Sequence, residues 1–210
     1  MLHELAGRIP PNHTRNASAL SVAESAAEAA RGWWGLAALR LLGASACMAF
    51  AHGVLYAFFT LHLERVGYSG AAIGAFWTLG VVAEIAVFLW LPALFQRFAL
   101  PAILAVSLLC AVARFLAIGW GAAYLWVLVP AQLLHGATFG AFHAASVAAV
   151  QRVFAEAAQA RGQALLSSFG YGAGGAAGML ASGWAWEAGG AGMAFSLAAG
   201  VALAGIFLAY

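Results

Sequence analysis

Apolar residues run almost without interruption from about residue 41 onward, and short polar or Gly/Pro-containing stretches divide them into blocks. A helix needs about 20 apolar residues to cross the roughly 30 Å of hydrocarbon in a bilayer. The blocks predict six membrane-spanning helices, at residues 41–63, 71–94, 100–119, 122–150, 162–185 and 189–210. Ser69 and Pro101 stand at two of the expected helix starts, as an N-cap residue and a first-turn proline.

Composition indicates an all-α membrane protein rather than a soluble domain. Of the 210 residues, 65% are hydrophobic and 8% are charged, whereas soluble domains carry about 25% charged residues. So few charges could not cover the core of a soluble fold, and the apolar excess excludes a disordered chain. The net charge is only +2 and the sequence contains no lysine, which disfavours a nucleic-acid partner.

The arginines that flank the predicted spans indicate the orientation. Cytoplasmic segments of membrane proteins are enriched in Lys and Arg. With the N-terminus inside, only Arg65 lies outside, while five arginines are cytoplasmic: Arg31, Arg40, Arg97, Arg152 and Arg161. We therefore expect both ends in the cytoplasm, in a protein of the bacterial inner (plasma) membrane.

The first 35 residues differ from the rest of the chain. They lack a long apolar block, and Ser21 with Glu24 resembles a capping box that opens a short helix. We expect residues 1–35 to form a cytoplasmic tail or the remnant of an inter-domain loop, and residues 36–210 to form one six-helix transmembrane domain.

Two ionisable residues, Glu84 and Arg114, lie near the middle of the second and third predicted spans. Each costs roughly 2.5–3.5 kcal/mol at the centre of a membrane helix on insertion scales. On antiparallel neighbouring helices they could face a shared interior. They could be an ion pair that joins two helices, or a proton or substrate-anion site in a water-filled cavity.

Histidines lie at compatible depths in two other spans, with His52 in the first and His135 and His143 in the fourth. A neutral imidazole can both carry a proton and hydrogen-bond a substrate near pH 7. A single buried histidine is more often a packed structural residue. A polar and aromatic stripe at helical spacing strengthens the functional interpretation: Gln132, His135, Phe139, Phe142 and His143.

Small residues at a spacing of four predict close helix packing. Gly170, Gly174 and Gly178 form one such ridge, and Gly136 with Gly140 forms a shorter one. The sequence contains no P-loop, no HExxH and no CxxC motif. We therefore expect no cofactor and no metal ion.

Three stretches together resemble one family of transporters. AHGVLYAFFTLHLERVGYSGAAIGAFWTLGVVAEI (51–85) resembles the seventh and eighth helices of the major facilitator superfamily. LHGATFGAFHAASV (134–147) and ARGQALLSSFGYGAGGAAG (160–178) resemble its tenth and eleventh helices in the 3-phenylpropionic acid transporter group, which is lactose-permease-like. The resemblance covers roughly residues 36–210.

This resemblance implies half of a major facilitator fold, the C-terminal six helices of a twelve-helix transporter. It further implies proton-coupled symport by alternating access through a cavity between two halves. The expected partners are the lipid bilayer, a small organic substrate and protons, with an N-terminal half or a second copy of the chain to complete the cavity. Of the superfamily's basic cytoplasmic loop motif, this sequence keeps only Arg97.

Our hypothesis is a secondary transporter, not an enzyme, for a small organic acid that could be aromatic. Glu84 and His135 would handle the proton, and Arg114 would bind the carboxylate. The remaining substrate-contacting candidates line the path or its apolar walls: Gln132, His135, His143, His52, Tyr56 and Trp77. Two alternatives remain, a six-span haem- or quinone-binding redox protein with histidine ligands, and an inactive truncated half-transporter.

Overall fold

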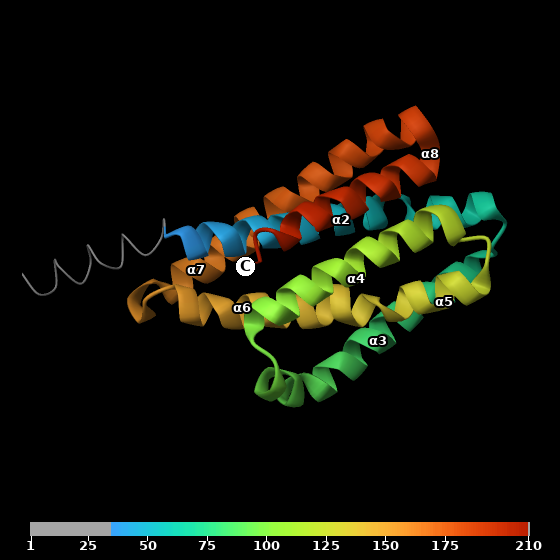
Figure 1. Ribbon diagram of the computed structural model, residues 1–210. Coiled ribbons are helices and arrows are strands. Elements are labelled where there is room, and N and C mark those ends of the chain that lie inside the picture. Colours follow the sequence, from blue (N-terminus) through green and yellow to red (C-terminus); the bar gives the residue numbers. More distant parts are fainter. Residues whose placement is uncertain (1–34, 210) are drawn as a thin grey trace, which may run out of the picture.

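The computed structural model describes residues 35–209, and every regular element within that range is helical (Figure 1). The elements in chain order are α2 (Leu36–Val66), α3 (Gly70–Arg97), α4 (Leu100–Gly121), α5 (Leu125–Leu133), the π-helix η1 (Gly136–Ala141), α6 (Phe142–Val153), the 3₁₀ turn η2 (Glu156–Ala158), α7 (Gln159–Leu165), the π-helix η3 (Leu166–Ala173) and α8 (Gly174–Ile206). The predicted N-terminal tail, with its capping box at Ser21 and Glu24, lies outside the described residues apart from position 35.

Five helical stretches between residues 35 and 209 are long and apolar enough to span a membrane, one fewer than the six predicted. They are Leu36–Val66, Gly70–Arg97, Leu100–Gly121, Leu125–Val153 and Glu156–Ile206. The last stretch joins the fifth and sixth predicted spans. It contains two non-helical residues, Gly189 (φ −155°, ψ 19°) and Gly190 (φ 65°, ψ −156°), and the ribbon of α8 turns back on itself (Figure 1). Gly190 has a positive φ that residues with a Cβ rarely adopt.

Successive connections lie at opposite ends of the molecule. Figure 1 shows the α2–α3 and α4–α5 connections at the same end as the turn within α8, and the α3–α4 and α6–α7 connections toward the other end. Local signals fix several of these ends. The Ser69 side chain accepts a hydrogen bond from the Ala72 amide at 3.3 Å, and Pro101 stands in the first turn of α4, which confirms both predicted helix starts.

Helix α2 packs at the centre of the molecule, because glycines let α8 approach it very closely. A Cβ on Gly174 would lie 2.6 Å from the Ala46 carbonyl oxygen, and a Cβ on Gly178 would overlap the Phe50 carbonyl oxygen. On α2 itself, a Cβ on Gly53 would lie 2.5 Å from the Gly175 carbonyl oxygen. The two backbones therefore touch along several turns, as small-residue ridges allow in membrane helices.

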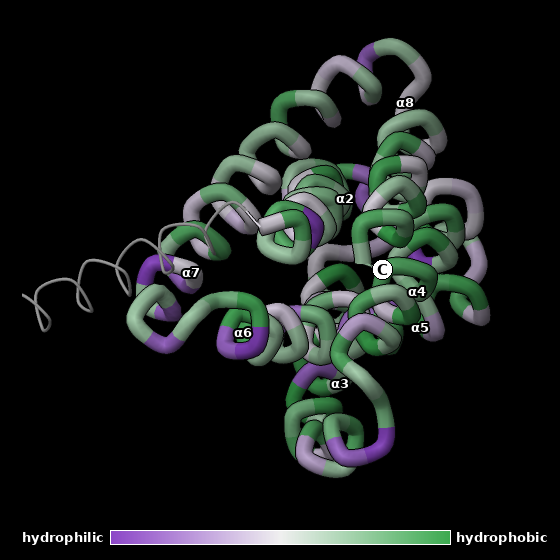
Figure 2. Tube along the Cα trace, turned by 60° about the vertical axis from the view of Figure 1, so that its left-hand side comes forward, coloured by the Kyte–Doolittle hydropathy of each residue, from purple (hydrophilic) through white to green (hydrophobic). Residues whose placement is uncertain are grey.

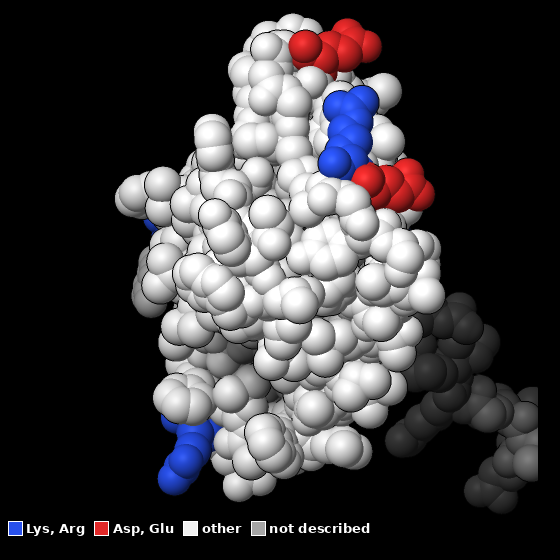
Figure 3. Space-filling view, turned by 90° about the vertical axis from the view of Figure 1, so that its right-hand side faces the viewer, with Lys and Arg blue, Asp and Glu red and all other residues white. Residues whose placement is uncertain are grey.

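The outer surface is largely apolar. Helix α3 exposes a row of large side chains that includes Val82, Ile85, Leu89 and Trp90. Green apolar segments lie on the outside of the helices as well as between them (Figure 2), and charged side chains occupy only a few places at the edges of the view in Figure 3. Lipid can solvate such a surface, whereas soluble monomers rarely expose large continuous apolar patches.

Two π-helical segments interrupt otherwise α-helical stretches. Segment η1 lies between α5 and α6, and η3 lies between α7 and α8. π-Helical turns are rare and occur frequently at functional sites. Segment η1 packs on α3, where a Cβ on Gly136 would lie 2.5 Å from the Ala83 carbonyl oxygen, and Gly170 of η3 faces Ser45 of α2.

The contact between α2 and α8 yields a stability prediction. Gly178→Ala should lower the free energy of unfolding by about 1–3 kcal/mol, the usual cost of overpacking, because the new methyl group would overlap the Phe50 carbonyl oxygen. Gly183→Ala on the same helix is the matched control, since its Cβ would meet nothing within 4 Å. Thermal denaturation in detergent checks both variants, and equal midpoints would contradict this packing.

Candidate functional site

Arg114 lies at the centre of the polar interior. Its side chain is fully buried, although it belongs to the apolar helix α4. Its Nε donates to the Ala131 carbonyl oxygen at 3.0 Å, and its Nη1 donates to the Thr138 hydroxyl oxygen at 3.1 Å. Its Nη2 donates to Gln132 Oε1 at 3.2 Å. Helix α5 and segment η1 thus surround the guanidinium with neutral acceptors.

His52 supplies a fourth, longer contact to the guanidinium. Its Nδ1 lies 3.0 Å from the Met48 carbonyl oxygen, which can only accept, so Nδ1 carries the hydrogen. The lone pair of Nε2 therefore faces Nη1 of Arg114, at 3.4 Å. This arrangement requires a neutral imidazole, and it makes His52 an acceptor for Arg114 rather than a second positive charge.

No carboxylate pairs with Arg114 among the described residues. The four partners of its side chain are a carbonyl, a hydroxyl, an amide and a neutral imidazole, and together they occupy four of its five N–H groups. A buried charge normally has an opposite charge beside it. Arg114 thus presents a positive charge that neutral dipoles solvate but do not neutralise.

Glu84 pairs with His135 and not with Arg114. Its Oε2 lies 3.7 Å from His135 Nε2, and no ion pair joins Glu84 to Arg114 within residues 35–209. One interpretation of the sequence, an ion pair between Glu84 and Arg114, is therefore wrong. Glu84 instead contacts the imidazole of His135. Glu84 packs over Gly140, where a Cβ would lie 3.1 Å from its Cγ.

A stacked aromatic row runs along the helical stretch that contains η1. The rings of His135 and Phe139 are 5.4 Å apart between centroids, and those of Phe139 and His143 are 6.1 Å apart, with interplanar angles of 11° and 9°. His52 from α2 meets the edge of Phe139 at 5.7 Å. The stacked row therefore connects His135, which contacts Glu84, with the region around His143.

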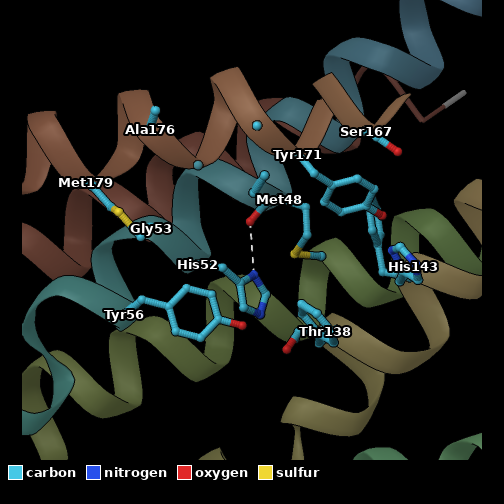
Figure 4. Close-up of a pocket in the computed structure, with 15 residues that line it drawn as sticks. Met48, His52, Gly53, Tyr56, Thr138, His143, Ser167, Tyr171, Ala176 and Met179 are labelled. Atoms are coloured by element: carbon cyan, nitrogen blue, oxygen red, sulfur yellow. Dashed lines mark hydrogen bonds between the residues drawn. The ribbon is translucent and has the colours of Figure 1, made fainter. Parts of the chain in front are cut away.

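A cavity of about 650 Å³ lies beside this row, between α2, the η1–α6 stretch and the η3–α8 stretch. Its lining includes His52, Tyr56 and Thr138 at one end, and His143 and Tyr171 at the other (Figure 4). The cavity is open along one side, where Tyr56 and Met179 are 47% and 46% exposed. Its walls are mainly apolar, with polar groups at both ends.

The predicted site residues divide into three groups. Arg114, Gln132, His135 and Glu84 form a cluster behind the cavity wall, while His52, Tyr56 and His143 line the cavity itself. Trp77 is at the periphery, where it stacks on Tyr56 at 6.0 Å and donates to the Thr60 hydroxyl. The predicted glycines pack helices together: Gly136 and Gly140 against α3, and Gly170, Gly174 and Gly178 against α2.

Two further residues of the site, Thr138 and Tyr171, were not predicted from the sequence. Thr138 bonds Arg114, and its place one turn after His135 on the polar stripe was the available signal. Tyr171 lies in a glycine-rich run, where the spacing of Gly170 and Gly174 indicated helix packing but gave no reason to single out the tyrosine. Among residues 35–209 no group of three or more His, Cys, Asp or Glu side chains could hold a metal ion.

Comparison with known proteins assigns the family. Residues 35–197 match the MFS_1 like family, which is well over half of the chain. The chain belongs to this family. Its members are membrane transport proteins of the major facilitator superfamily, not enzymes, as the sequence predicts.

A curated relative gives a more specific likeness for this MFS_1-like chain. It is 35% identical over 108 residues to the probable 3-phenylpropionic acid transporter of Escherichia coli (strain K12). The match covers 51% of this chain and 28% of that protein, so the chain aligns with less than a third of its relative. No solved structure matches the chain.

The acceptors around Arg114 yield a second stability prediction. Thr138→Val removes an acceptor from a buried guanidinium and should lower the free energy of unfolding by about 1–3 kcal/mol. Thr78→Val is the matched control, because the exposed Thr78 hydroxyl bonds only the Gly74 carbonyl of its own helix. Denaturation midpoints in detergent compare the two, and a Thr138→Val protein as stable as the control would refute this role.

Proposed function

We propose that this chain transports a small organic anion, an aromatic carboxylic acid, across the membrane by proton-coupled symport. The observation that carries the proposal is the buried guanidinium of Arg114, which has no carboxylate partner among the described residues. An anionic ligand would supply the missing charge in a site of low dielectric constant. The aromatic character follows from the likeness to the probable 3-phenylpropionic acid transporter and from the aromatic walls of the cavity.

The carboxylate would reach Arg114 by displacing His52. His52 and Thr138 line the cavity and also bond Arg114, so they lie between the cavity and the charge. The His52 contact is the longest of the four, at 3.4 Å, and His52 keeps its separate bond to Met48. A carboxylate that replaces this contact would gain a charge-assisted hydrogen bond, which is stronger than the neutral one.

Glu84 and His135 would carry the coupling proton. A carboxylate 3.7 Å from an imidazole can share one proton between two groups at the edge of the anion site. His135 also stacks on Phe139, which lines the cavity, so two residues, His135 and Phe139, would connect a change of charge at Glu84 to the ligand. Proton uptake would then neutralise Glu84 when the anion enters.

The topology we propose is six spans with both ends in the cytoplasm. The break at Gly189 and Gly190 supports two spans within the stretch Glu156–Ile206, and the alternating connections fit six passes (Figure 1). Four of the flanking arginines then share the cytoplasmic side, with Arg65 opposite: Arg40, Arg97, Arg152 and Arg161. The likeness to the Escherichia coli relative supports a place in a bacterial inner membrane.

A second six-helix unit would close the open side of the cavity. Tyr56 and Met179 are about half exposed on that side, and in η3 the residues Ser167, Ser168 and Phe169 are exposed. We propose that an N-terminal half or a second copy of the chain covers these residues. The cavity would then open to each side of the membrane in turn as the two units rock.

The role of Arg114 is tested by uptake of labelled 3-phenylpropionate into proteoliposomes under an inward proton gradient. Arg114→Ala should reduce uptake to the level of empty liposomes, because no other buried cation is described near the cavity. Arg152→Ala, at the exposed end of α6, should retain wild-type uptake. Uptake by Arg114→Ala equal to wild type would refute the anion site. If the wild-type chain alone takes up no acid, co-expression with an N-terminal half follows.

The role of Glu84 is tested by separating uptake from exchange. Glu84→Gln should abolish proton-driven uptake but leave part of the exchange of labelled for unlabelled acid, because exchange moves no net proton. Glu187→Gln, on an exposed part of α8, is the control and should retain both activities. Loss of both activities in a Glu84→Gln protein that inserts normally would argue against a coupling role.

A further inference from the structure

Tyr56 of α2 lines the same end of the cavity as His52, and its ring is held in place while its hydroxyl is not. The ring stacks on Trp77, with 6.0 Å between centroids and an interplanar angle of 10°. Trp77 is itself fixed, because its Nε1 donates to the Thr60 hydroxyl at 3.2 Å and its ring packs edge-on with Phe59 at 5.1 Å. No hydrogen bond engages the Tyr56 hydroxyl within residues 35–209. Tyr56 therefore presents a positioned hydroxyl group without a protein partner.

The hydroxyl end of Tyr56 is directed toward His52 (Figure 4). The two residues are four apart on α2 and so share one face of the helix, with their ring centroids 6.2 Å apart. His52 contacts Nη1 of Arg114 at 3.4 Å, and it is the group that an entering carboxylate would displace. The Tyr56 side chain is 47% exposed on the open side of the cavity, so a ligand there can reach it. The hydroxyl thus lies beside the route from the cavity to the guanidinium.

The other hydrogen-bond donors of the cavity are either engaged or distant. Six side chains that line it carry an O–H or N–H group: His52, Tyr56, Thr138, His143, Ser167 and Tyr171. The last three lie at the far end in Figure 4. At the near end, His52 donates from Nδ1 to the Met48 carbonyl at 3.0 Å, and Thr138 donates to the His135 carbonyl at 3.4 Å. Within the part of the chain that the structure describes, Tyr56 is therefore the near-end side chain whose donor has no acceptor.

A carboxylate at Arg114 would need such a donor. Displacement of His52 frees one N–H group of Nη1, while the other three bonded N–H groups keep their acceptors on Ala131, Thr138 and Gln132. A carboxylate has two oxygens with about four acceptor sites, so the contact with Nη1 leaves most of them unfilled. Acceptors of a charged group that are buried without a donor are costly, and the remaining cavity wall is mainly apolar. The hydroxyl of Tyr56 is the group that can donate to the second oxygen.

We propose that the Tyr56 hydroxyl donates a hydrogen bond to the substrate carboxylate, so that the carboxylate bridges Tyr56 and Arg114. This inference rests on the proposed function and adds a second substrate-binding group to its anion site. A hydrogen bond to an ionised acceptor is shorter and stronger than one between neutral groups. Arg114 supplies the charge that attracts the acid, and Tyr56 fixes where the second oxygen lies. The sequence suggested Tyr56 as part of the substrate path or its apolar walls, whereas its hydroxyl gives it a polar role.

The test removes the hydroxyl and keeps the ring. Ligand-detected NMR titrations measure binding of 3-phenylpropionate to the full chain in lipid nanodiscs, for wild type and for Tyr56→Phe. The dissociation constant should rise roughly 10- to 100-fold in the variant, as expected for the loss of one hydrogen bond to a charged group. Infrared difference spectra of the bound acid with an isotope-labelled carboxylate should show a shifted antisymmetric stretch, because one oxygen has lost its donor. The thermal midpoint should not change, since the Tyr56 hydroxyl has no protein partner to lose.

Tyr124→Phe is the matched control. Tyr124 is exposed, stacks on Trp126 at 5.9 Å and does not line the cavity, so this variant should keep the wild-type affinity and spectrum. Wild-type affinity in Tyr56→Phe would overturn the proposal while leaving the anion site at Arg114 intact. Weaker binding with an unchanged carboxylate stretch would also overturn it, because the tyrosine would then act only through the shape of the wall. Failure of wild type to bind the acid would instead overturn the proposed function, and this inference with it.

Discussion

The arrangement of the interior between the helices depends on one constraint, the need to solvate the buried charge of Arg114, which has no carboxylate partner among the described residues. A guanidinium at the centre of a membrane protein is costly unless each of its donors finds an acceptor. Here α5 and η1 provide a carbonyl, an amide and a hydroxyl, and α2 adds His52. These contacts hold three helical stretches in fixed positions around α4. The cavity lies beside His52, whose contact with Arg114 is the longest of the four.

The close approach of the backbones makes that arrangement possible. Gly174 and Gly178 bring α8 onto α2, and Gly136 brings η1 onto α3. The second contact places Glu84 beside His135 instead of leaving its carboxylate toward lipid. Packing and electrostatics are thus coupled, since the small residues that join the helices also decide which charged groups meet.

Hydropathy alone predicted the first four helical spans, because a bilayer demands long apolar blocks and the breaks at Ser69 and Pro101 carry clear capping signals. The fifth and sixth predicted spans form one stretch, Glu156–Ile206. Periodicity also predicted that Gln132 and His135 share one face of a helix, and the depths of Glu84 and Arg114 in neighbouring spans suggested that these two face a shared interior. It could not predict that Glu84 would pair with His135, since that depends on how α3 is rotated against η1. It could not locate the π-helical segments either, because one extra residue in a turn leaves no mark in composition. Thr138 and Tyr171 were not predicted because their contacts, with Arg114 and His143 respectively, are made with other helices.

The most direct test of the central claim is to supply Arg114 with a carboxylate from within the protein. Gln132 Oε1 already lies 3.2 Å from Nη2, so Gln132→Glu introduces a negative charge with almost no change of shape. Binding of 3-phenylpropionate and the thermal midpoint are measured together for this variant. The midpoint should rise while acid binding is lost, because the internal carboxylate at Nη2 neutralises the charge that would attract the ligand. Unchanged affinity for the acid in a folded Gln132→Glu protein would contradict the claim that the unpaired charge of Arg114 is the anion site.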